Sequence, residues 1–156
     1  ASTQVIVDAV RSFATGFIFT TSLPPAITAG CLASVEHLKA NSTERDRLHA
    51  QTAKLRERLK HHDVPVMPCS QTHVLPVRVG EAKRCKAAAE RLLHNHGVYL
   101  QPINYPSVPV GTERFRVNAT PNHSDAQIEH LAVSLRETFD YFSIPLASEV
   151  FAAEVA

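Results

Sequence analysis

Two segments of this 156-residue chain carry side chains of types that can bind anions. The first is residues 16–25, which begin with a run of aromatic and β-branched residues. Three consecutive residues with hydroxyl groups follow, Thr20, Thr21 and Ser22, shortly before two prolines. Hydroxyl groups beside a helix N-terminus suit a phosphate group, because both supply hydrogen-bond donors to it. The same hydroxyls could instead only cap the helix that the prolines begin, and the residues leave both interpretations open.

The second segment, residues 103–117, is a proline-stiffened loop that leads into a strand with Arg114 and Arg116. Side chains two positions apart on a strand point to the same face. An arginine there could bind a carboxylate through two parallel hydrogen bonds. On the residues alone, a surface salt bridge is the simpler interpretation of these arginines.

Other kinds of site find little support in the sequence. The nine histidines include the pairs His61–His62 and His94–His96, whose members would lie on different faces of a helix, so we predict no metal site. The formal net charge of +1 gives no argument for a nucleic-acid partner. No apolar run approaches the roughly 20 residues of a membrane-spanning helix. The three cysteines form no disulfide framework.

Hydrophobic periodicity predicts the elements that position these segments. Residues 64–142 read as a small α+β unit, an antiparallel sheet covered by helices on one face. The first 40 residues offer a single strand, which cannot form a sheet alone. We expect helices over residues 3–13, 26–39, 43–62, 81–96 and 124–142, and strands over residues 17–21, 64–66, 73–79, 98–100 and 114–118.

The two anion-binding segments resemble the 5-aminolevulinate synthases, a branch of the α-oxoamine synthases. Residues 16–25 look like the segment that follows the cofactor lysine in that family, and residues 103–112 look like its substrate loop. Residues 114–121 are similar to the strand after the loop, and residues 64–69 and 73–80 also match. The similarity runs from about residue 2 to residue 142, which is most of the chain.

The resemblance implies an α/β fold, that of a fold-type I transferase dependent on pyridoxal 5'-phosphate (PLP). Residues 1–62 would be the end of the large PLP-binding domain with its connecting helices. Residues 63–142 would be the C-terminal α+β small domain, and residues 143–156 the start of a C-terminal extension. Members of the family are homodimers with active sites at the subunit interface, so we expect the same here.

The family's site residues carry over to five positions of this sequence. Thr20 and Thr21 would contact the PLP phosphate, reaching from one subunit into the site of its neighbour. Arg116 would hold the carboxylate of glycine. Ser107, where the family usually has threonine, and Ile103 would line the succinyl-CoA site.

The implied activity is that of an acyltransferase. It is the decarboxylating condensation of glycine with succinyl-CoA to give 5-aminolevulinate, CoA and CO₂, the first step of haem biosynthesis. The Schiff-base lysine of the family follows a glycine, and none of the five lysines here has that context. We therefore expect that lysine to lie upstream, no catalytic residue to lie in this fragment, and the fragment to be inactive alone.

Two features depart from the family pattern or extend it. Val110 stands where arginine is common, and residues 118–121 replace a more proline-rich version of the strand end. The residues after Phe142 resemble the C-terminal extension of eukaryotic members, which favours a mitochondrial matrix location.

Two alternatives stay open from the sequence. One is a sister α-oxoamine synthase such as 2-amino-3-ketobutyrate CoA ligase. The other is a non-catalytic α+β domain that binds a partner through the charge-rich helix of residues 43–62.

Overall fold

The computed structural model describes residues 2–21 and 23–151. The chain divides into two compact units, Ala1–Ser42 and Thr43–Ala156. The predicted division after residue 62 differs from this one, because the helix that begins at Thr43 belongs to the second unit. That helix is held there by Leu55 and Leu59, which are 1% and 0% exposed in the core.

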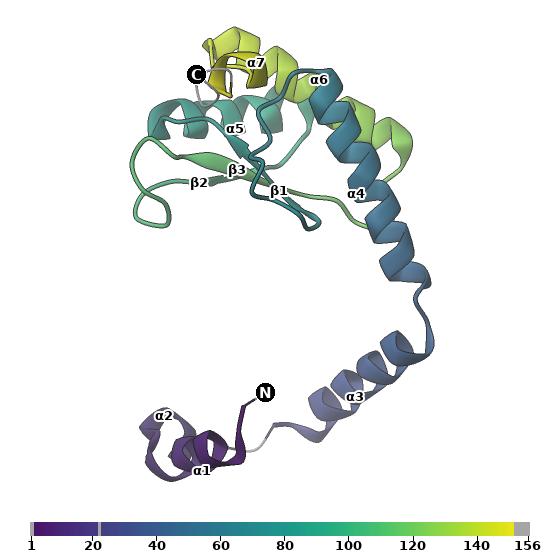
Figure 1. Ribbon diagram of the computed structural model, residues 1–156, viewed down its shortest axis with the longest axis vertical. Helices are drawn as coiled ribbons and strands as arrows, with labels where there is room; N and C mark the ends of the chain where they lie inside the picture. The colour runs from purple at the N-terminus through teal and green to yellow at the C-terminus, as the bar shows by residue number, and fades with distance from the viewer. Residues whose placement is uncertain (1, 22, 152–156) are drawn as a thin grey trace. The chain divides into compact units, whose positions relative to one another are not determined.

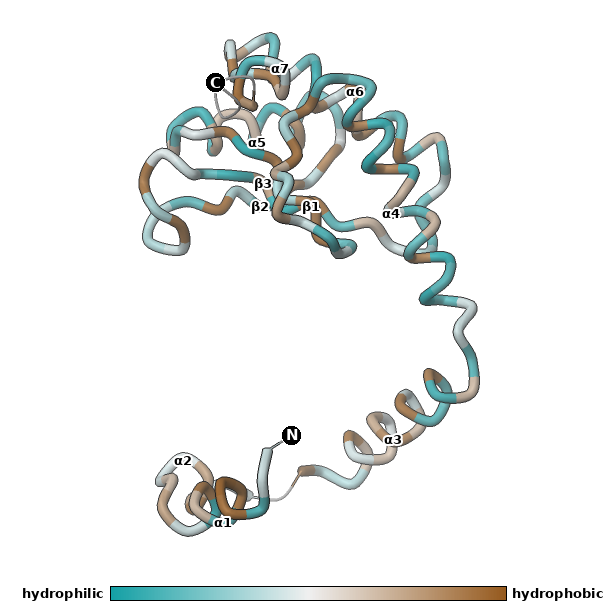
Figure 2. The backbone as a smooth tube through the Cα atoms, in the orientation of Figure 1, coloured by the Kyte–Doolittle hydropathy of each residue, from teal (hydrophilic) through white to brown (hydrophobic). Residues whose placement is uncertain are grey.

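The first unit consists of three helices, α1 (Gln4–Phe13), α2 (Thr15–Ile18) and α3 (Pro25–Ala40). A proline occupies the first turn of α3, as the sequence predicts. The described residues of these helices include none that is buried. Figure 2 shows hydrophobic colour over much of α1, so this apolar helix surface lies exposed.

The strand predicted over residues 17–21 is wrong. The backbone instead forms α2 and then a turn, with the N–H groups of Phe17 and Ile18 both donating to the carbonyl of Ala14 at 2.9 Å. A strand needs a neighbour for its backbone groups, and the described residues of this unit include no other strand. Local helical hydrogen bonds therefore satisfy these groups.

The second unit is a three-stranded antiparallel sheet of order β1-β3-β2, with α5 and α6 over one face (Figure 1). This is the small α+β unit that the sequence predicts. Its elements are α4 (Thr43–His61), β1 (Val74–Arg78), α5 (Ala82–His96), β2 (Gln101–Ile103), β3 (Arg114–Asn118), α6 (Asp125–Phe142) and α7 (Ala147–Val150).

The two faces of the sheet differ in chemistry. Phe115 and Val117 of β3 point into the core, as do Leu75 and Val77 of β1. The alternate residues therefore lie on the other, open face, where the register sets Arg78 opposite Arg114 and Pro76 opposite Arg116. The helices contribute the rest of the core, including Cys85, Ala88, Leu92, Ile128, Ala132, Leu135 and Phe139.

Local signals explain where α5 and α6 begin and end. The Ser124 hydroxyl accepts a hydrogen bond from the Gln127 N–H at 3.2 Å, and the Gln127 side chain accepts from the Ser124 N–H at 2.9 Å. These two bonds form a capping box at the start of α6, where the sequence predicts a helix to begin. Gly97 ends α5 in the left-handed conformation, with φ of 66°.

Two predicted strands differ from the structure. The N–H of Val98 donates to the carbonyl of Leu92 at 2.9 Å, so it closes the end of α5, and pairing begins only at Gln101. The predicted strand at residues 64–66 is reduced to one isolated bridge, between Val66 and Val77.

The residues after α6 pack onto the same unit. Ile144 is buried, and α7 is tied to the end of α4 by Asp63. The carbonyl of Asp63 accepts from the Ala147 N–H at 2.9 Å, and its carboxylate accepts from the Ser148 N–H at 3.0 Å. Residues 152–156, the rest of the predicted extension, lie outside the described residues.

Candidate functional site

The open face of the sheet presents the predicted carboxylate-binding arginine. Arg116 is exposed, and within the described residues its side chain makes no hydrogen bond or ion pair. Its neighbour Arg114 is half-buried, and its Nε donates to the Thr112 carbonyl at 2.9 Å. Arg116 is therefore the arginine whose five N–H donors remain available to an anion.

A loop of residues 104–113 connects β2 to β3 beside this arginine. Ile103, at its start, pairs with Arg114 in the sheet, and Ser107 is exposed within it. The backbone N–H of Ser107 donates to the Asn104 carbonyl at 2.9 Å, which gives this part of the loop a defined turn. Arg116, Ile103 and Ser107 thus lie on adjoining elements of one unit.

Two further residues of this loop are not among the site residues predicted from the sequence. The Oδ1 atom of Asn104 is buried and has no hydrogen-bond partner within the described residues. Glu113 is a charged residue only 2% exposed, and it accepts a hydrogen bond from the Gly111 N–H at 2.9 Å. Alternation along the strand could have indicated Glu113, because it lies two positions before the core residue Phe115.

The predicted phosphate-binding hydroxyls lie in the first unit. Thr20 and Thr21 line a cavity of about 750 Å³ together with Arg11, Phe17, Ile18 and Leu23. The Thr20 hydroxyl donates to the Phe17 carbonyl at 2.7 Å. Arg11, which is not among the site residues predicted from the sequence, places a positive charge in the same cavity as the two hydroxyls. Ser22 lies outside the described residues.

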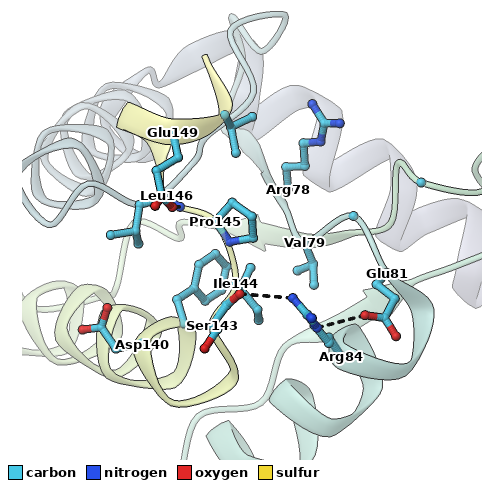
Figure 3. A pocket seen from close by; sticks show the side chains of 14 residues that line it. Arg78, Val79, Glu81, Arg84, Asp140, Ser143, Ile144, Pro145, Leu146 and Glu149 are labelled. Carbon is cyan, nitrogen blue, oxygen red and sulfur yellow. Dashed lines mark hydrogen bonds and ion pairs between the residues drawn. The ribbon is translucent and has the colours of Figure 1, made fainter. Parts of the chain in front are cut away.

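A larger cavity, of about 960 Å³, contains none of the predicted site residues. It lies between the start of α5 and the residues that follow α6 (Figure 3). Its charges compensate one another, since Arg84 pairs with Glu81 at 2.9 Å and donates to the Ser143 carbonyl at 3.1 Å. This pairing of charges gives no reason to place a substrate there.

Neither a metal centre nor a membrane span appears in the part of the chain that the structure describes. No three His, Cys, Asp or Glu side chains there come together as metal ligands. None of the helices there is both long enough and apolar enough to cross a membrane.

The model of the aminotransferase class I and II family matches residues 1–135. The chain belongs to this family. Solved structures agree at the level of the fold. Serine palmitoyltransferase from S. paucimobilis matches with a TM-score of 0.77 at 24% identity, covering 87% of this chain and 34% of that one. The 8-amino-7-oxononanoate synthase from Francisella tularensis matches with a TM-score of 0.75 at 20% identity, covering 92% and 42%. The predicted fold-type I class is confirmed.

Members of the aminotransferase class I and II family that are similar in sequence include 5-aminolevulinate synthases. That of Bradyrhizobium diazoefficiens is 46% identical over 154 residues, covering 99% of this chain and 37% of the relative. That of Rhizobium meliloti is 51% identical over 128 residues, covering 82% and 31%. The mitochondrial enzyme of Schizosaccharomyces pombe is 40% identical over 145 residues, covering 92% and 26%. The chain thus spans about a third of the length of the curated relatives it matches.

These relatives include both bacterial and mitochondrial enzymes. The alignment with the Bradyrhizobium enzyme covers 99% of the chain, including nearly all residues after Phe142. That segment therefore does not separate mitochondrial from bacterial members of the family.

Proposed function

We propose that this chain is part of a 5-aminolevulinate synthase, which condenses glycine with succinyl-CoA to give 5-aminolevulinate, CoA and CO₂. The observation that carries the proposal is Arg116, a guanidinium with no partner among the described residues, on the open face of a sheet beside the loop that holds Ser107. The similarity to enzymes of that name, at 40–51% identity, supports the same activity.

Arg116 would bind the carboxylate of glycine. A planar guanidinium forms two parallel hydrogen bonds with a carboxylate, so it fixes the orientation of the amino acid as well as its position. Orientation matters because the bond that is broken at Cα must be aligned with the electron-accepting group. We therefore expect loss of Arg116 to affect both glycine binding and rate.

Ser107 and Ile103 would contribute to the succinyl-CoA site. Ser107 offers a hydroxyl that can donate to a carboxylate or carbonyl oxygen, and Ile103 offers apolar surface at the end of β2. The Oδ1 atom of Asn104 is buried and has no partner within the described residues. It would accept a hydrogen bond from a donor that lies outside the described residues.

The residues of the first unit fit the phosphate of PLP, which a solved serine palmitoyltransferase similar to this chain contains together with myriocin. Two hydroxyls and the guanidinium of Arg11 line one cavity, and these groups suit an anion. Thr21 and Arg11 would donate directly, whereas Thr20 would first release the Phe17 carbonyl. PLP, when bound, accepts electrons from the Cα of an amino acid. We propose further that Thr20 and Thr21 serve the site of a neighbouring subunit in a homodimer.

The glycine role is tested by Arg116→Leu in the full-length protein. We expect the KM for glycine to rise at least about tenfold, because a charge-assisted, two-pronged interaction is lost. The absorbance of bound PLP should be retained. Arg58→Leu is the matched control, since Arg58 is an exposed arginine of α4 that pairs with Glu129 at 3.2 Å. Unchanged glycine kinetics in Arg116→Leu would contradict the assignment.

The phosphate role is tested by changing Thr20 and Thr21 together to valine. We expect weaker PLP retention during dialysis, followed by the absorbance of the bound cofactor, with the fold unchanged. Thr28→Val removes another exposed hydroxyl of the same unit, one that donates to the Pro24 carbonyl at 3.3 Å, and should retain PLP. Equal retention by both variants would rule out the proposed contact.

The two alternatives are separated by simple measurements. A preference of the full-length protein for acetyl-CoA over succinyl-CoA, with glycine, would favour the sister ligase. The α+β binding domain is less well supported, because charged side chains of α4 already pair within the unit, Lys54 with Asp125 at 2.8 Å and Arg58 with Glu129 at 3.2 Å. A mitochondrial matrix location stays a prediction.

A further inference from the structure

Glu113 is a buried carboxylate that the proposed chemistry does not use. It lies directly before β3 and is 2% exposed. Burying a carboxylate costs free energy unless it is hydrogen-bonded, so Glu113 needs a hydrogen-bond donor at this point. Its neighbours identify that donor and show which part of the chain the contact stabilises.

The backbone of Glu113 joins the loop end to β1. Its carbonyl accepts from the N–H of Val79 at 2.8 Å and from the N–H of Gly80 at 2.9 Å. Because Val79 and Gly80 directly follow β1, these two bonds extend the contact between β1 and β3 beyond the strands themselves. The main chain at Glu113 is therefore fixed to the sheet.

The side chain of Glu113 turns back onto the loop. Its Oε2 accepts from the backbone N–H of Gly111 at 2.9 Å. Gly111 has φ of 84°, in the left-handed region that favours glycine, so the loop turns sharply at this position. The carboxylate thereby satisfies a backbone donor and holds the turn in one conformation.

The next residues carry this restraint into the loop. The N–H and hydroxyl of Thr112 donate to the Pro109 carbonyl at 3.1 and 2.7 Å. The Thr112 carbonyl accepts from Arg114 Nε at 2.9 Å. A chain of short contacts thus runs from the sheet, through Glu113 and Gly111, to the part of the loop that follows Ser107.

We propose that Glu113 is a positioning residue that holds the loop of residues 104–112 in place for the acyl substrate, acting as the hydrogen-bond acceptor of the Gly111 N–H. The inference rests on the proposed function, because it takes Ser107 and Ile103 to face succinyl-CoA. Glycine binding depends instead on Arg116, which is set by the strand itself.

The test compares three substitutions in the full-length protein. Glu113→Gln keeps an oxygen acceptor and removes the charge. Glu113→Asp keeps the charge and draws the oxygens back toward the main chain by about one C–C bond, roughly 1.5 Å. Glu113→Ala removes both. Glu81→Gln is the matched control. Glu81 is an exposed carboxylate that pairs with Arg84, and it lines the same cavity as Gly111 (Figure 3).

We expect Glu113→Asp and Glu113→Ala to raise the KM for succinyl-CoA about tenfold, corresponding to one lost hydrogen bond to a charged group. The KM for glycine should stay within about twofold, and Glu113→Gln should restore most of the succinyl-CoA affinity. Glu81→Gln should match the wild type. Equal losses for both substrates, or a Glu113→Asp variant that behaves as wild type while Glu113→Gln is impaired, would overturn the proposal.

A second readout does not depend on activity. Hydrogen–deuterium exchange of the full-length protein should show faster exchange at residues 104–112 in Glu113→Asp, with β3 protected as before. Unchanged exchange there would also overturn the inference. If the wild-type protein forms no 5-aminolevulinate, the proposed function fails, and the exchange result still decides whether Glu113 holds the loop. If Glu113→Ala does not fold, the Asp and Gln variants carry the comparison.

Discussion

The two units of this chain use apolar residues in opposite ways. The second unit buries them in one continuous core beneath its sheet, with Leu59, Leu75, Phe115 and Phe139 all 0% exposed. The first unit has apolar helices too, yet Phe13 is 82% exposed and the helices include no buried residue among those described. Apolar composition alone therefore does not make a stable unit. An apolar face has to meet another one.

The largest expected effect comes from separating the units. Residues 43–156 expressed alone should unfold cooperatively in urea, because their core is complete within the unit. Residues 1–42 alone should lose helical signal gradually, without a cooperative transition, because helices this short are marginal without packing. Circular dichroism during urea titration measures both. A sharp transition in residues 1–42 would break the contrast.

A single core substitution should repeat the contrast on a smaller scale. Phe139→Ala removes a ring that is 0% exposed and should lower the free energy of unfolding of residues 1–156 by about 3–5 kcal/mol. The same change at Phe13, which is 82% exposed, should alter it by less than about 0.5 kcal/mol. Comparable losses at both positions would show that Phe13 is packed in solution.

The same contrast explains what the sequence could predict. In the second unit the signals are local and agree with the packing: the capping box at Ser124 and the left-handed stop at Gly97 lie at the predicted helix ends, and β3 alternates over the predicted strand. In the first unit, the aromatic and β-branched residues 17–21 predict a strand, but a strand also needs a partner, which pattern alone does not supply. The error falls where the structure depends on neighbours.

The candidate site divides along the same line. Arg116 could be predicted to face away from the core because strand alternation sets its direction. Arg11 could not be associated with Thr20 and Thr21 from the sequence. Their shared cavity depends on α2 and the turn after it, where a strand was predicted instead. Glu113 was missed for another reason. A charged residue is expected to be exposed, and only its contact with Gly111 shows why it is buried.

The core of the second unit should also respond to alkaline pH through Cys85. Burial raises the pKa of its thiol from 9.0 to about 11, with a smaller contribution from the negative charge of Glu113. The unfolded chain loses this proton at lower pH than the folded one. The stability that the protonated thiol contributes is therefore complete below pH 9 and is lost as the pH rises to about 11.

We expect this loss to be about 2 kcal/mol, measured as the free energy of unfolding in urea at several pH values. Cys85→Ala should remove that part of the pH dependence. Val77→Ala changes another core side chain that is 0% exposed. It should lower the free energy of unfolding equally at every pH, so that the pH dependence of stability stays that of the wild type. Identical slopes for wild type and Cys85→Ala would show that the thiol is not buried as described.

The smallest effect compares one substitution in both units. Gly97 has φ of 66° and nothing within 4 Å of an added Cβ, so Gly97→Ala should cost about 1 kcal/mol from backbone strain alone. Gly16 lies within α2, outside the left-handed region, and its added Cβ would also meet nothing within 4 Å. Gly16→Ala should therefore leave the free energy of unfolding unchanged and slightly increase helical content. Because neither change alters packing, a measurable loss at Gly16 would mean that α2 gives way to another conformation, one in which that glycine is required.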